Sequence, residues 1–163
     1  MNYDIRNLSV YFPGIHSRSY IDTNGCVYTS LSPSLKKIMI DGKRYTITSF
    51  IQNHISELNK TDKQIMKMPF SKDYYLMYDG TVLQRLKTKI TDNQRVIVHL
   101  VCIEKQKQLE VSRLVAGAFI GNIYGMEVHH KDQNRLNNHV ENLQIMTFDE
   151  HRGKGHHKEN HSL

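Results

Sequence analysis

Three histidines in the last third of the chain have residue types and a spacing that suit metal-assisted hydrolysis. His129 and His130 are adjacent, and His151 follows after a stretch rich in Asn, Asp and Gln. Two imidazoles and water molecules can form an open shell around a divalent cation, which leaves positions for phosphate oxygens. A third imidazole, neutral at pH 7 and not bound to the metal, could remove a proton from water. A structural zinc site would require four protein ligands, so the pattern favours a catalytic site.

The segments around these histidines are predicted to form a strand, a loop, a second strand and a short helix. They lie at 126–129, at 131–138, at 143–147 and from 147 onward. The loop prediction comes from its amide side chains, which can hold the backbone by hydrogen bonds. Thr147 and Glu150 have the spacing of a capping box, so a helix is expected to begin there. This order can bring His129 or His130 close to His151.

This segment resembles the ββα-metal motif (His-Me finger) of the HNH endonucleases, especially the small phage and intron-encoded homing enzymes. The matching residues are Val128-His129-His130-Lys131-Asp132, Asn134, Asn137-Asn138, Glu141-Asn142-Leu143 and Glu150-His151. Upstream, Val111-Ser-Arg113-Leu-Val-Ala116 resembles the helix of the same family. The likeness covers roughly residues 74–157.

The resemblance implies a role for each matching residue. His130 is expected to be the general base that activates water, and His129 and His151 are expected to hold one divalent metal, Mg²⁺ or Mn²⁺, with Zn²⁺ as a substitute in crystals. Asn142 is expected to fix the loop so that His130 is correctly aimed. Hydrolysis would leave 5′-phosphate and 3′-hydroxyl ends. The residues expected to contact DNA are Arg113, Lys131, Asn134, Arg135 and Arg152.

Three features of the segment need an explanation in the structure. Neighbouring strand residues point to opposite faces, so His129 and His130 can approach one phosphate only if the strand bends or ends there. Gln133 stands where the family usually has glycine, which costs about 1 kcal/mol if the turn needs a positive φ. Ser112 stands where the family helix usually has histidine.

Two hairpins are predicted further upstream, with two-residue turns at Asn24-Gly25 and Asp79-Gly80. Each is followed by further strand-like residues and by an amphipathic helix pattern, at 47–55 and at 111–119. The longer strand-like stretches are expected at 37–47, with a turn at Asp41-Gly42, and at 95–111, with a turn at 105–108. One interpretation is a unit used twice. The alternative is that hairpins and helices of this kind look alike without duplication.

We therefore predict an α+β fold, with a β-hairpin-rich N-terminal half joined to a C-terminal ββα-metal nuclease domain. The expected divisions are a hairpin and helix module at 1–57, a linker at 58–72, the nuclease domain at 73–157 and a tail at 158–163. Between residues 36 and 72 there are eight Lys or Arg against three acids. This excess suits a DNA-recognition arm, although a solvated lysine-rich face has the same composition.

The composition supports a nucleic-acid partner and excludes several classes of protein. The 163 residues contain 22 Lys and Arg against 16 Asp and Glu, for a net charge of +6. Two cysteines exclude a disulfide framework, and no segment has the length or apolarity of a membrane span or a secretory signal. The expected location is the cytoplasm, which is the host cytoplasm if the gene belongs to a phage, and no obligate protein partner is evident.

These observations lead to a metal-dependent HNH endonuclease that nicks or cuts double-stranded DNA, with homing as the expected setting. The alternative is a catalytically inactive DNA-binding regulator on the same scaffold. A toxin nuclease is less well supported, because no translocation or immunity-binding segment is recognisable.

Overall fold

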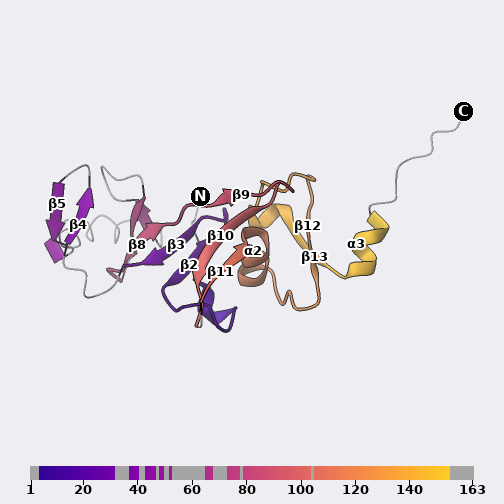
Figure 1. Cartoon of the computed structure of the whole chain (residues 1–163), viewed down its shortest axis with the longest axis horizontal. Helices are drawn as coiled ribbons and strands as arrows, with labels where there is room; N and C mark the ends of the chain where they lie inside the picture. The colour runs from indigo at the N-terminus through magenta and orange to yellow at the C-terminus, as the bar shows by residue number, and fades with distance from the viewer. Residues whose placement is uncertain are drawn as a thin grey trace, which may run out of the picture.

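The computed structural model describes residues 4–31, 37–40, 43–46, 48–49, 52, 65–67, 73–77, 79–103 and 105–154. Within these ranges strands predominate over helices, and the chain has the predicted α+β character (Figure 1). The candidate site lies toward the end of the molecule that carries the C-terminus, and the β4–β5 hairpin (Lys37–Ile40 and Lys43–Thr46) lies at the other end (Figure 1).

A six-stranded antiparallel sheet joins both predicted hairpins. Its strands, in spatial order, are β1 (Ile5–Asn7), β2 (Ser19–Asp22), β3 (Val27–Ser30), β8 (Val82–Arg85), β7 (Tyr74–Met77) and β6 (Ile65–Lys67). The β2–β3 and β7–β8 hairpins therefore lie side by side, joined by β3 and β8.

The prediction of two-residue turns was wrong in the same way for both hairpins. In the first, Gly25 N–H donates to Asp22 O and Asp22 N–H donates to Cys26 O, which closes a three-residue loop. Gly25 alone adopts a left-handed φ, of 78°, whereas a two-residue turn would also require one at Asn24. Gly80 has a φ of 85° and its turn makes the corresponding hydrogen bonds. The shared turn is consistent with a unit used twice.

A second sheet supports the longest helix of the described chain. It consists of β11 (Gln106–Glu110), β10 (Val96–Val101) and β9 (Lys89–Ile90), and its β10–β11 turn lies at 102–105, earlier than predicted. Helix α2 (Val111–Phe119) follows β11 directly, as its amphipathic pattern predicts. Its apolar face, which includes Leu114 and Val115, is buried.

The main core is shared by the two ends of the chain. Residues of the first 30 positions, namely Leu8, Ile15, Ile21 and Val27, pack in one cluster with residues of β10, α2 and Leu143. The short η1 helix (Leu8–Val10) contributes the first of these side chains. The N-terminal hairpin is thus part of the hydrophobic core beneath the histidine segment, and its turn can influence the site.

Several predicted boundaries fall largely outside the described residues. This applies to the helix expected at 47–55, to most of the stretch at 58–72 and to the tail at 158–163. Within 58–72, β6 forms an edge strand of the sheet, and Ile65 is buried against a smaller core cluster with Ile5, Tyr28 and Leu83. These three residues of the expected linker belong to the sheet because an apolar side chain at 65 reaches that cluster.

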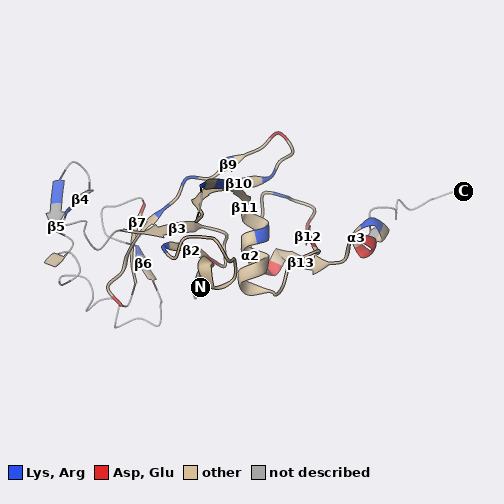
Figure 2. Ribbon diagram, turned by 60° about the horizontal axis from the view of Figure 1, so that its bottom comes forward, with Lys and Arg blue, Asp and Glu red and all other residues tan. Residues whose placement is uncertain are grey.

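Lys and Arg occur on the β4–β5 hairpin, on β9 and on the helices near the site (Figure 2). No helix among the described residues has the length and apolar character needed to span a membrane.

Candidate active site

The histidines lie on a two-stranded hairpin followed by a short helix. Strand β12 (Glu127–His130) pairs with β13 (Leu143–Met146), so that His129 is opposite Gln144 and His130 is opposite Leu143. The 3-10 helix η2 (Val140–Asn142) leads into β13, and α3 (Phe148–Lys154) follows it. The predicted order of strand, loop, strand and helix is confirmed.

A capping box starts the last helix and places His151. Thr147 N–H donates to Glu150 Oε2 at 2.7 Å, and Glu150 N–H donates back to Thr147 Oγ1 at 3.3 Å. His151 N–H then donates to Thr147 O in the first turn of the helix. The ring of His151 stands edge-to-face with that of His129, and their centroids are 5.6 Å apart.

Asn142 ties the two ends of the loop between the strands. Its Nδ2 donates to Asp132 Oδ1 at 2.9 Å and to Asn137 O at 2.8 Å, and its Oδ1 accepts from Asp132 N–H at 3.1 Å. Hydrogen bonds from Asn137, Asn134 and Asn142 hold the pKa of Asp132 below its usual value. The contacts of Asn142 are those that its expected loop-fixing role requires.

Gln133 occupies the left-handed backbone region, with a φ of 61°. Gln133 N–H donates to His130 O at 3.0 Å, which closes a turn directly after His130, and the positive φ of Gln133 directs the chain that follows. β12 therefore ends at the second histidine. Both His129 and His130 line one pocket despite their alternation along the strand.

Substitutions at Gln133 test this conformation. Gln133→Val is expected to lower the free energy of unfolding by about 1–2 kcal/mol, because a β-branched residue is strained at positive φ, whereas Gln133→Gly is expected not to lower it. Urea denaturation of the three proteins measures the difference. An equal loss in both variants would show that a positive φ is not required there.

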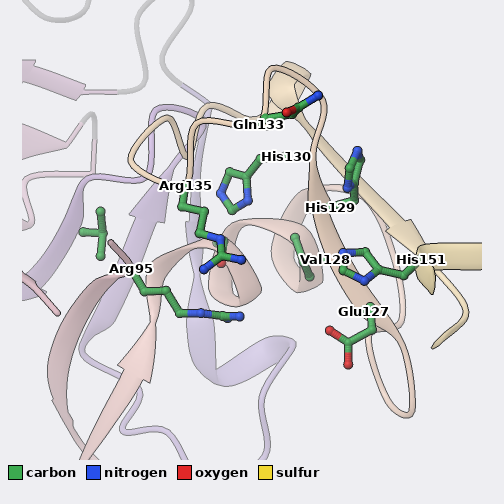
Figure 3. A pocket seen from close by; sticks show the side chains of 10 residues that line it. Arg95, Glu127, Val128, His129, His130, Gln133, Arg135 and His151 are labelled. Atoms are coloured by element: carbon green, nitrogen blue, oxygen red, sulfur yellow. The ribbon is translucent and has the colours of Figure 1, made fainter. Parts of the chain in front are cut away.

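The pocket brings the three histidines together with two arginines. Its lining consists of Arg95, Val96, Ser112, Glu127, Val128, His129, His130, Gln133, Arg135 and His151. Figure 3 shows His129 and His151 on one side and the two arginines on the other, with His130 between them. Arg95 Nη1 donates to Glu110 Oε2 at 2.6 Å, and Arg135 Nη1 donates to Asn93 O at 3.3 Å. These contacts hold two guanidinium groups at the edge of a histidine cluster, which suits a phosphate ligand.

Of the five residues expected to contact DNA, only Arg135 lines this pocket. Arg113 donates from Nη1 and Nη2 to the carbonyl oxygens of Met126 and Ile123, and so holds the segment that leads into β12. Lys131 Nζ donates to Glu141 O at 2.7 Å. Asn134 makes loop hydrogen bonds with Asp132 and Leu136, and the guanidinium of Arg152 lies 4.2 Å from the centroid of the Phe148 ring.

Three residues at the site were given no role there from the sequence, although Asn138 belongs to the matched motif. Arg95 precedes β10 and Glu127 begins β12, and both line the pocket. Asn138 is buried, and its Oδ1 lies 3.1 Å from His130 Nε2. The paired asparagines at 137–138 signalled a fixed loop, but no local pattern singled out Arg95, which is distant in the sequence.

The residues present fit a metal held by two protein ligands. Imidazole nitrogens bind Zn²⁺ at about 2.1 Å. Two imidazoles whose ring centroids lie 5.6 Å apart can therefore both reach one ion. Among the described residues no group of three or more His, Cys, Asp or Glu side chains could hold a metal. A shell built on His129 and His151 would therefore keep several positions for water and phosphate oxygens.

Comparison with known proteins gives one consistent family. Residues 110–152 match the family model described as HNH endonuclease. An uncharacterised HNH endonuclease, L245 of Acanthamoeba polyphaga mimivirus, is 29% identical over 140 residues, which cover 79% of this chain and 42% of the relative. This chain therefore spans less than half the length of that relative.

The structure also resembles a solved one, reported for DNA binding and cleavage by the HNH homing endonuclease I-HmuI. The TM-score is 0.51 at 20% identity, and the match covers 93% of this chain and 56% of the other. The similarity in fold thus extends well beyond residues 110–152.

Proposed function

Because residues 110–152 match the HNH endonuclease family model, we propose that this chain is a metal-dependent endonuclease that hydrolyses phosphodiester bonds of double-stranded DNA. The observation that supports this most directly is the pocket that contains His129, His130 and His151 beside two arginines. The proposed general base, the proposed cation-binding pair and the proposed phosphate-binding arginines all line this pocket.

In this proposal His130 takes the proton from the attacking water. Its Nε2 is engaged with Asn138, so Nδ1 is the ring nitrogen that can accept a proton. The guanidinium groups of Arg95 and Arg135 would contact the nonbridging oxygens of the scissile phosphate, where negative charge increases in the transition state. Asn142 keeps the loop closed, so that His130 does not move away during the reaction.

His129 and His151 would hold one divalent cation, Mg²⁺ or Mn²⁺, whose Lewis acidity stabilises the negative charge on the phosphate and on the leaving 3′ oxygen. Zn²⁺ is expected to occupy the same pair of imidazoles under crystallisation conditions.

DNA is the proposed substrate because the chain carries a net charge of +6 and basic side chains occur from the β4–β5 hairpin to α3. Lys131, Asn134 and Arg152 remain proposed contacts to the DNA backbone outside the pocket, and Arg113 is proposed to act through the chain that it holds. The residues at 1–57 are proposed to extend the contact along the duplex. A homing endonuclease of a phage or other mobile element, acting in the cytoplasm of its host, is the proposed biological setting.

The test is cleavage of a supercoiled plasmid by the full chain with Mg²⁺ or Mn²⁺. We expect nicked or linear product, and no product when EDTA removes the metal, because two imidazoles alone do not neutralise the phosphate. His129→Ala and His151→Ala are expected to require a higher metal concentration for the same rate. Mapping the ends on a DNA library identifies the sites and should find 5′-phosphates.

A regulator that binds DNA without cutting it would give a different result. In that case the wild type and the His130→Ala variant would shift DNA equally in a gel, and neither would cut with either metal.

A further inference from the structure

The imidazole of His130 is held by the side chain of Asn138, in the loop between β12 and β13. Asn138 Oδ1 lies 3.1 Å from His130 Nε2, and Asn138 is only 6% exposed. The orientation of the amide follows from its other contact, because Asn138 Nδ2 donates to Leu136 O at 3.4 Å. The flipped amide would place two acceptor oxygens against each other.

This orientation selects one tautomer of His130. Since Asn138 Oδ1 can only accept, His130 Nε2 must carry the proton and donate it. Nδ1 is then left with its lone pair, and within the described part of the chain it has no hydrogen-bond partner. The ring that lines the pocket is therefore oriented with the nitrogen that can act as a base available to a ligand.

The turn between β2 and β3 packs against Asn138. A Cβ atom built on Gly25 would lie 3.1 Å from Asn138 Cβ and 3.0 Å from Val111 Cγ1, so the turn is in close contact with both residues. Beside this contact, Val140 N–H donates to Thr23 O at 2.9 Å. The β2–β3 turn, far from the histidines in the sequence, thus contacts the loop at Asn138 and Val140 without lining the pocket.

We propose that Asn138, seated on the β2–β3 turn, is a positioning residue that holds His130 in its Nε2–H tautomer and aims Nδ1 at the attacking water. The proposal rests on the proposed function for its effect on cleavage, but the tautomer itself is a property of the protein without metal or DNA. The β2–β3 turn would then act on cleavage through Asn138, without contacting the reacting atoms itself.

Nitrogen NMR of the full chain, labelled with ¹⁵N-histidine, tests the tautomer directly. At about pH 8, where an imidazole is ordinarily neutral, the wild type is expected to show an Nε2–H proton of His130 that is protected from exchange with water. His130→Gln assigns the signal by removing it. Asn138→Leu, of similar size but without an acceptor, should abolish the protection, whereas Asn138→Asp should keep it.

Cleavage kinetics provide the second measurement. Asn138→Leu is expected to lower kcat by about tenfold or more at unchanged KM, because a freely rotating base is rarely aligned, and Asn138→Asp should recover most of the loss. If the leucine variant does not fold, the comparison of Asn138→Asp with the turn variants below still tests the proposal.

Alanine substitutions at two glycines with a positive φ distinguish the contact of the turn with Asn138 from backbone strain alone. Gly25→Ala is expected to weaken the protected Nε2–H signal and lower kcat, because its Cβ would displace Asn138. Gly14→Ala is the matched control, since Gly14 has a φ of 97° and no atom within 4 Å of an added Cβ. It should leave both readouts as in the wild type.

Two results would contradict the proposed role of Asn138. A proton on Nδ1 of His130, or an Nε2–H signal that persists in Asn138→Leu, would overturn the proposal. A wild type that shows the expected tautomer but cuts no DNA with any metal would support Asn138 as the positioning residue and refute the endonuclease function.

Discussion

Replacing His130 with glutamine is expected to lower kcat for plasmid cleavage by about 10²–10⁴-fold. Glutamine has a similar reach and can still donate to Asn138, but its amide cannot accept a proton from water at neutral pH. The loss is therefore expected in kcat, with little change in KM, because the missing interaction belongs to the transition state. Initial rates of plasmid cleavage at saturating Mg²⁺ measure it.

The control for this substitution is a histidine outside the pocket. His99 is exposed on β10 and does not line the site, so His99→Gln should cut as the wild type does. Gel-shift titration in EDTA should give the His130→Gln variant the same Kd for DNA as the wild type. An unchanged kcat in the His130→Gln variant would rule out His130 as the base and would leave the three-histidine pocket without its proposed use.

Replacing Asp22 with alanine is expected to destabilise the whole core. Asp22 is fully buried, and its side chain accepts from the N–H groups of Asn24 and Cys26 at 2.9 Å and from the hydroxyl of Tyr28 at 2.8 Å. Burial, together with the adjacent Asp22, raises the pKa of Tyr28, so this hydroxyl stays protonated and continues to donate. Removing the acceptor leaves buried donors unsatisfied, and the expected loss is roughly 3–4 kcal/mol of unfolding free energy, or about 10 °C in Tm.

The second hairpin supplies a matched control. Asp79 lies in the corresponding turn, but it is exposed, and its Oδ1 accepts from Thr81 N–H at 2.8 Å. Asp79→Ala should therefore cost about 1 kcal/mol or less. Thermal unfolding followed by circular dichroism compares the two variants. Equal losses would mean that the buried hydrogen bonds of Asp22 add nothing beyond a surface turn.

The local architecture of the site could be predicted from short stretches of sequence. The capping box of Thr147 and Glu150 involves residues three positions apart, and the helix at 111–119 follows from apolar spacing alone. The amide-rich loop could be recognised for the same reason, because its side chains bond to backbone within a few residues, whereas the loop-fixing role of Asn142 came from the resemblance to the HNH family. The resemblance to the HNH family supplied the roles of the three histidines, which spacing by itself could not assign.

The exact turns and one strand were predicted poorly because weak local preferences compete with packing. Asn-Gly permits a two-residue turn, but the buried Asp22 side chain binds the N–H groups of Asn24 and Cys26 and thereby stabilises a three-residue loop. The strand within the polar stretch at 58–72 was not predicted, because the pattern along the chain did not reveal that the side chain of Ile65 is buried where β6 pairs at the edge of the sheet.

The remaining features depend on contacts between residues that are far apart in the chain. Arg95 reaches the pocket because β10 and β12 both pack around α2, and Arg113 turns inward because the carbonyl oxygens of Ile123 and Met126 face it. Gly25 supports Asn138 only once the first hairpin is buried beneath the loop. Residue type and spacing specify which groups are available and which elements form, since those depend on neighbours along the chain. Which side chains meet around the histidines is decided when the core closes, because burial of apolar surface brings distant segments to a few fixed positions.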